Sequence, residues 1–224
     1  MHPEDTSAPA KRQGPRSAIV LVGGGGHAVV VAEIAHALGQ PVAGVLDDNH
    51  QCPAAARLRL PLLGGLRSVD AMRKAASSGA RYVVCVGSIA VRRELIALLD
   101  PAHAAPALVH PSAVVAPSAD LGVGVAVCPR AVVHSFASVA AHAIINTGAI
   151  VEHDVRVGEN THVAPGSVLA GSSSVGADTL IGLHACVLPR VRVGDRCVVG
   201  AGAAVLADVA SGACVVGVPA RAKR

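Results

Sequence analysis

The chain has 224 residues, of which 52% are hydrophobic and 1% aromatic, and a net charge of +4. This length allows one large or two modest domains. The visible charge clusters lie at the two chain ends, which argues against a nucleic-acid-binding protein. No apolar stretch is long enough for a membrane span or a secretion signal, so we expect a cytoplasmic protein. Six cysteines without a Cys-x-x-Cys pair predict packing roles rather than disulfides.

Residues 1–16 are rich in proline, alanine and charged side chains, and we expect them to form a flexible tail. Short apolar runs then alternate with segments of helical character. Strands are predicted at 17–22, 41–46 and 81–86, and helices at 28–38, 69–78 and 90–99. This alternation predicts a small Rossmann-like parallel sheet. We assign residues 17–106 to this α/β domain, and its last six residues to a linker.

A glycine-rich turn joins the first predicted strand to the first predicted helix. Gly23-x-Gly25-x-x-Ala28 matches the dinucleotide fingerprint, and Asp47 follows at the end of the next strand. The glycines let a phosphate approach the backbone, and the helix N-terminus favours an anion. Because the domain is only about half the size of a dinucleotide fold, the pattern favours a mononucleotide or a nucleotide sugar. A tight turn without a ligand is the alternative.

The second half of the chain carries an aliphatic residue at every sixth position from 109 to 205. These residues are Val109, Val115, Leu121, Val127, Val133, Val139, Ile145, Val151, Val157, Val163, Leu169, Val175, Ile181, Val187, Val193, Val199 and Val205. A fixed six-residue period over this length predicts a hexapeptide-repeat β-helix, in which each hexad forms one face of a three-sided coil. We assign residues 107–210 to it, and residues 211–224 to a segment that covers its far end.

His153 is the strongest catalytic candidate among the histidines. Glu152 and Asp154 flank it, and a carboxylate can orient an imidazole and raise its basicity. One coil further on, Gly171 occupies the equivalent position and leaves space beside the ring. The sequence therefore predicts a general base at His153. A solvated surface histidine is the alternative.

The other histidines of the repeat do not form one column. His134, His142, His162 and His184 stand at differing offsets from the nearest aliphatic residue. A zinc hydratase, which is another activity found on hexapeptide prisms, needs three convergent ligands. The scattered offsets argue against such a site, so no metal is predicted.

Several segments together resemble the left-handed β-helix nucleotide-sugar N-acetyltransferases, which act on UDP-4-amino-4,6-dideoxysugars or GDP-perosamine, and the related sialic-acid O-acetyltransferases. The resemblance covers residue 17 to the end of the chain. It is carried by the glycine turn ending at His27, Val45-Leu46-Asp47-Asp48, His110-Pro111-Ser112-Ala113, Asn146-Thr147, Glu152-His153-Asp154 and Gly217-Val218-Pro219-Ala220.

The resemblance implies a left-handed coil and a homotrimer with active sites between neighbouring prisms. It further implies acetyl-CoA as co-substrate, His153 as general base, and Asn146 as a residue that positions the sugar or the acetyl group. The nucleotide would bind at the α/β domain. The residues implied for that site are Gly24, Gly25, Gly26, His27, Asp47 and Asp48. On the donor side, His162 matches a histidine near acetyl-CoA, and a backbone N–H near Gly171 would stabilise the oxyanion.

Together these features predict an acetyl-CoA-dependent N-acetyltransferase that transfers the acetyl group directly to a nucleotide-linked amino-deoxysugar. The paired Asp47-Asp48 favours UDP slightly over GDP. O-acetylation of sialic acid or a related sugar needs the same histidine and is the nearest alternative. A trimeric scaffold that binds a sugar nucleotide without catalysis is the non-enzymatic alternative.

Overall fold

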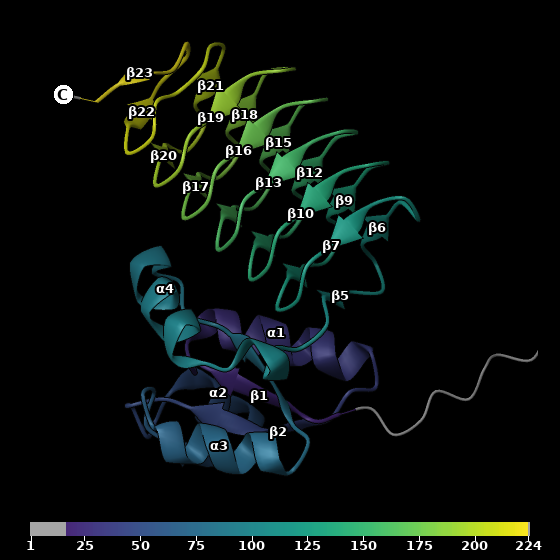
Figure 1. The fold of residues 1–224 in the computed structure, drawn as a ribbon, viewed down its shortest axis with the longest axis vertical. Coiled ribbons are helices and arrows are strands. Elements are labelled where there is room, and N and C mark those ends of the chain that lie inside the picture. Colours follow the sequence, from purple (N-terminus) through teal and green to yellow (C-terminus); the bar gives the residue numbers. More distant parts are fainter. Residues whose placement is uncertain (1–16, 224) are drawn as a thin grey trace, which may run out of the picture.

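The computed structural model describes residues 17–223, and in it an α/β part lies at the lower end of a long β-helix (Figure 1). The tail expected at residues 1–16 lies outside the described residues. No helix within the described residues is long and apolar enough to cross a membrane.

The α/β part is built on a four-stranded parallel sheet with strand order β3-β2-β1-β4. Its elements are β1 (Ile19–Val22), α1 (Gly26–Ala37), β2 (Val42–Leu46), α2 (Pro53–Leu58), β3 (Leu62–Gly64), α3 (Val69–Ser77), β4 (Arg81–Val84) and α4 (Ile89–Leu98). Helices α1 and α2 pack on one face of the sheet, and α3 and α4 pack on the other. A short 3₁₀ helix at Pro101–His103 leads into the β-helix.

The α/β topology was predicted, but α2 and β3 were missed. With six and three residues, the two elements are too short for apolar periodicity to reveal them. Pro53 stands at the first position of α2, where its missing N–H costs nothing, and Arg59 ends the helix in the left-handed conformation. The parallel sheet therefore has one strand more than predicted.

The hexad repeat folds into a left-handed parallel β-helix of three sheets, as predicted. The eight-stranded sheet contains β5 (Leu108–Val109), β8 (Ala126–Val127), β11 (Ile144–Ile145), β14 (His162–Val163), β17 (Leu180–Ile181), β20 (Val198–Val199), β22 (Cys214–Val216) and β23 (Arg221–Ala222). The six-stranded sheet contains β6 (Val114–Val115), β9 (Val132–Val133), β12 (Ile150–Val151), β15 (Val168–Leu169), β18 (Cys186–Val187) and β21 (Ala204–Val205). The five-stranded sheet contains β7 (Asp120–Leu121), β10 (Ser138–Val139), β13 (Arg156–Val157), β16 (Ser174–Val175) and β19 (Arg192–Val193).

Each predicted aliphatic residue is the second residue of its strand and points into the prism, where it stacks on its equivalents in the neighbouring coils. Hydroxyl groups replace some alanines at the narrow corners. Thr161, Ser167 and Thr179 are fully buried, and each donates a hydrogen bond to a carbonyl on the next coil at 2.6 to 2.9 Å. These three hydroxyls are therefore satisfied, as buried polar groups require, whereas the buried hydroxyl of Ser173 in the same column has no partner within residues 17–223.

The prism is covered along one flank and at its upper end. The α/β part packs on the outer face of the lowest strands of the eight-stranded sheet, where Leu108, Ala126 and Cys128 join the apolar cluster around α1. At the upper end, β23 pairs antiparallel with β22 and closes the edge as a hairpin. Covering the edges removes unpaired strand groups that would otherwise template aggregation.

Candidate active site

His153 and Asp154 form a hydrogen-bonded pair where the chain turns from the six-stranded to the five-stranded sheet. The Nδ1 atom of His153 lies 2.8 Å from Oδ2 of Asp154. Asp154 has a φ of 60°, a left-handed conformation that aspartate tolerates in turns. The carboxylate favours the tautomer with its proton on Nδ1, which leaves Nε2 able to accept a proton. The His153 side chain is 60% exposed and thus accessible to a substrate.

The second flanking acid serves a different histidine. Oε1 of Glu152 lies 3.8 Å from Nε2 of His134, so the carboxylate that contacts His153 is that of Asp154. Gly171 provides the predicted space, because a Cβ atom there would lie 2.6 Å from Nε2 of His153. Any larger residue at position 171 would displace the ring.

A second cluster, formed by His27, Asn146 and His162, lies between the start of α1 and the outer face of the eight-stranded sheet. Nε2 of His162 is 2.9 Å from Nδ2 of Asn146, which fixes this nitrogen of His162 as the acceptor. Nε2 of His27 is buried and has no hydrogen-bond partner in residues 17–223. Asn146 and His153 stand at opposite ends of one coil face, so the structure groups Asn146 and His162 with His27, not with His153.

Both histidines of this cluster are held neutral. Burial, and then the charge of Arg92, lower the pKa of His27 to about 4. Burial, followed by the charges of Arg92 and His27, lowers the pKa of His162 to about 4 as well. Neither side chain would be protonated near neutral pH, so both can serve as hydrogen-bonding groups but not as cations.

These lowered pKa values predict acid sensitivity. A histidine with a pKa of 6.5 when unfolded and about 4 when folded takes up its proton first in the unfolded chain. Each such histidine should lower the free energy of unfolding by about 1 kcal/mol per pH unit as the pH falls from about 6.5 to 4, and have no effect above that window. His162→Gln should therefore make the pH dependence of urea unfolding shallower.

The matched control for this prediction is His36→Gln, which replaces an exposed histidine on the same protein. It should leave the pH dependence between about pH 4 and 7 as in the wild type. An equal slope in the wild type and in His162→Gln, at one fixed protein concentration, would contradict the assigned pKa of His162.

The predicted nucleotide residues meet at the carboxyl ends of β1 and β2. Oδ2 of Asp47 accepts a hydrogen bond from the N–H of Gly24 at 2.6 Å, so this carboxylate already braces the glycine turn. Asp48 accepts from the N–H of Leu66 at 2.9 Å. A Cβ atom at Gly25 or Gly26 would meet nothing within 4 Å, so the start of α1 faces open space. The glycine turn is therefore held by the Asp47 carboxylate on one side and open to a ligand on the other.

Comparison with known proteins places this chain in a family. Residues 18–99 match the family described as PglD N-terminal domain. PerB from Caulobacter crescentus, solved in complex with CoA and GDP-perosamine, is 37% identical, with a TM-score of 0.82 over 93% of this chain and 98% of that one. The acetyltransferase domain of PglB from Neisseria gonorrhoeae, solved also with acetyl coenzyme A, is 33% identical. Its TM-score is 0.82 over 93% of this chain and 100% of that one.

The chain belongs to the hexapeptide-repeat nucleotide-sugar N-acetyltransferases. WeeI from Acinetobacter baumannii, at 21% identity and a TM-score of 0.78 over 92% of this chain and 100% of that one, shares the fold. A search of curated protein sequences found no match. The protein is thus an acetyltransferase, as its sequence predicted.

The zinc-hydratase alternative needs three convergent metal ligands. Residues 17–223 contain no group of three or more His, Cys, Asp or Glu side chains arranged to hold a metal ion.

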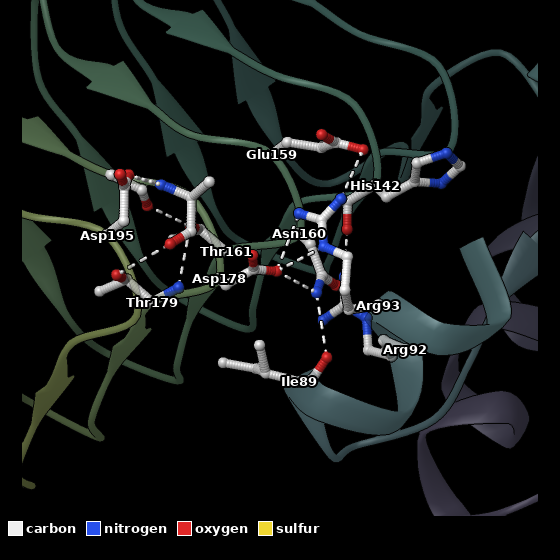
Figure 2. Close-up of polar contacts among 12 residues, drawn as sticks. Ile89, Arg92, Arg93, His142, Glu159, Asn160, Thr161, Asp178, Thr179 and Asp195 are labelled. Atoms are coloured by element: carbon white, nitrogen blue, oxygen red, sulfur yellow. Dashed lines mark hydrogen bonds and ion pairs between the residues drawn. The ribbon is translucent and has the colours of Figure 1, made fainter. Parts of the chain in front are cut away.

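One polar cluster of the N-acetyltransferase was missed by sequence reasoning. Arg92 and Arg93 on α4 reach the β-helix, where Arg93 contacts Asp178 and Glu159, and Asn160 contacts both α4 and Asp178 (Figure 2). The only signals in the sequence were two consecutive arginines and polar residues one coil apart. Those signals do not predict that α4 packs against the β-helix corner that carries Asn160 and Asp178.

Proposed function

We propose that this enzyme transfers an acetyl group from acetyl-CoA to the 4-amino group of a nucleotide-linked 4-amino-4,6-dideoxyhexose, with His153 as general base. The observation that carries the proposal is the exposed imidazole held by Asp154 on one nitrogen and given room by Gly171 at the other. PerB, 37% identical, was solved with CoA and GDP-perosamine, which supports this donor and this class of acceptor.

The reaction proceeds by direct attack. The amine nitrogen of the sugar attacks the thioester carbonyl carbon, and Nε2 of His153 accepts the amine proton as the new C–N bond forms. Asp154 holds the ring and stabilises the resulting imidazolium. The tetrahedral intermediate then collapses, the C–S bond breaks, and the imidazolium returns the proton to the leaving thiolate. No acyl-enzyme forms.

The developing oxyanion needs a hydrogen-bond donor close to His153. The N–H of Gly171 makes no hydrogen bond within residues 17–223, and its residue lies directly beside Nε2 of His153. We assign the oxyanion contact to this N–H, because preorganised backbone donors act most strongly where charge develops.

The acceptor nucleotide binds at the α/β part. Its phosphates lie over Gly24, Gly25 and Gly26 at the start of α1, where the N–H groups of Gly25 and Gly26, free within residues 17–223, and the helix dipole favour an anion. His27 has an unpaired nitrogen beside this turn, and Asp47 and Asp48 accept hydrogen bonds from the base or the ribose.

The outer faces of the β-helix support a trimer. The outward residues of the five-stranded sheet are polar: Asp120, Ser138, Arg156, Ser174 and Arg192. Those of the six-stranded sheet are apolar: Val114, Val132, Ile150, Val168, Cys186 and Ala204. Two upper outward residues of the eight-stranded sheet are also apolar: Leu180 is half-buried and Val198 is exposed, and both line a cavity beside the start of α4. Two different apolar faces on one prism fit a closed ring in which each packs on the other face of the next subunit.

This packing brings the two halves of the site together. His153 lies at the edge of the six-stranded face and would point toward the neighbour, at the height of that subunit's Asn146 and His162. Asn146 then contacts the sugar and His162 lies near the acetyl donor, each presented by the adjacent subunit. The separation of the two clusters within one chain is thus a consequence of sharing the site.

The test is release of free thiol from acetyl-CoA in the presence of UDP- and GDP-linked 4-amino sugars, the corresponding 4-hydroxy sugars, and free sialic acid. The proposal expects acceptor-dependent thiol release with at least one 4-amino sugar nucleotide and an amide in the product by mass spectrometry. Turnover only with hydroxyl acceptors would replace it with O-acetylation. Nucleotide-sugar binding without CoA binding would replace it with a scaffold.

A further inference from the structure

The α/β part is fastened to the β-helix by directional bonds at the start of α4 (Figure 2). Nδ2 of Asn160 donates to the carbonyl of Ile89 at 3.0 Å and to Oδ1 of Asp178 at 2.7 Å. The guanidinium of Arg93 donates to the same Asp178 oxygen at 2.8 Å and lies 3.2 Å from Oε1 of Glu159. We call Arg93, Asn160 and Asp178, together with the Ile89 carbonyl, the latch.

The latch is built to hold a fixed geometry. Asn160 is fully buried, and the Asp178 side chain is 21% exposed, so water competes poorly for these bonds. Burial alone would lower the pKa of Arg93, but its hydrogen bonds to Asp178 and Glu159 outweigh burial and raise the pKa. The preceding residue of α4, Arg92, is buried, and its guanidinium donates to the backbone carbonyl of His142. Bonds between charged and buried partners are stronger and more directional than apolar contact.

The latch lies at a distance from the apolar contact between the two parts. The apolar contact between α1 and the β-helix involves Ala105 of the linker and Leu108, Ala126 and Cys128 of the lowest coils. Asn160 and Asp178 belong to later coils and so lie farther along the prism. Apolar contact is non-directional and allows the α/β part to rock, whereas the latch fixes its angle at a distance from the pivot.

The latch also borders a space between the two parts. Ile89, Arg93 and Asp178 line a cavity of about 620 Å³, together with Gly87 and Ser88 of the β4–α4 loop and Leu180 and Val198 of the eight-stranded sheet. This loop follows the carboxyl end of β4, at the same edge of the sheet as the glycine turn. A change in the angle of α4 would therefore move the edge of the sheet that carries the acceptor site.

We propose that the latch sets the angle of the α/β part on the β-helix, and that Asn160 is a positioning residue for the acceptor amine. The inference rests on the proposed function, since it assumes that the acceptor is carried by the α/β part. Misplacing a reacting group by about 1 Å costs up to about 10²-fold in rate. The residues proposed for the donor, His162 and Gly171, belong to the β-helix, so donor binding should depend less on this angle than acceptor binding.

The test variant is Asn160→Gly. The φ of Asn160 is 56°, which glycine adopts without strain, so the change removes both side-chain bonds and leaves the corner intact. We expect kcat/KM for the nucleotide sugar to fall by about 10-fold or more, with KM for acetyl-CoA within about twofold of wild type. Arg93→Met should act in the same direction, and Arg93→Lys should retain part of the wild-type activity.

The matched control is Glu94→Gln, which removes the charge from the exposed pair that Glu94 forms with Arg67 within the α/β part. It should leave both kinetic parameters unchanged. An equal loss for donor and acceptor in Asn160→Gly, or no loss for either, would overturn the positioning role.

A second readout does not depend on acetyl transfer. Amide hydrogen exchange over 89–98 and 101–106 should be faster in Asn160→Gly than in the wild type and unchanged in Glu94→Gln. Faster exchange with an inactive wild type would uphold the latch and reject the proposed reaction. Unchanged exchange in Asn160→Gly would reject the latch itself, whatever the reaction.

Discussion

Replacing His153 with alanine should lower kcat for acetyl transfer by about 10²- to 10⁴-fold, the usual loss when a general base is removed. The imidazole is 60% exposed and packs on no core residue, so the variant should fold and assemble as the wild type does. Nucleotide-sugar and acetyl-CoA dissociation constants, measured by calorimetry, should stay within about threefold of wild type, because the lost group acts in the transition state and contributes little to ground-state binding.

Two variants make this result specific. Asp154→Asn keeps the shape of the turn but removes the carboxylate from Nδ1, so it should reduce kcat while leaving both dissociation constants unchanged. His36→Ala removes an exposed histidine on α1 and should have no effect. If His153→Ala retained kcat within about threefold of wild type for the best acceptor, His153 would not be the base.

The β-helix could be predicted from the sequence because one rule repeats along it. Every strand from β5 to β21 ends on a predicted aliphatic residue, and a single shifted residue would have exposed the column. The repeat loses its period at the upper end. There Val199 pairs with Val215, a spacing of sixteen residues where the preceding pairs are eighteen apart.

The site was predictable only in part, for physical reasons that differ between its halves. The space at Gly171 followed from the period, since residues eighteen apart stack in register. The partner of His153 did not, because either flanking acid can reach a histidine and only the left-handed turn at Asp154 decides which one does. Contacts between α4 and the β-helix, such as Asn160 with Ile89, depend on packing between segments of unrelated period, and no local pattern encodes them.

Mixed trimers test the shared site directly. His153→Ala removes the base, and Asp47→Ala removes the carboxylate that braces the glycine turn, so each variant alone should be inactive. If each site takes His153 from one subunit and the nucleotide residues from the next, random mixing in equal amounts should leave about a quarter of the sites intact. Purification of two differently tagged, co-expressed variants through both tags removes the uniform trimers. Each remaining mixed trimer has one intact site of three, so about a third of wild-type activity should be recovered.

The control is the same pair of variants purified separately and combined without subunit exchange, which should remain inactive. Because the tags isolate mixed particles, recovered activity can come only from sites built by two chains. Mixed particles without activity would mean that one chain supplies the whole site. His153 would then have to meet Asn146 and His162 within its own coil, yet the structure places them at opposite ends of one face. The outcome thus decides between a shared site and a rearrangement within one subunit.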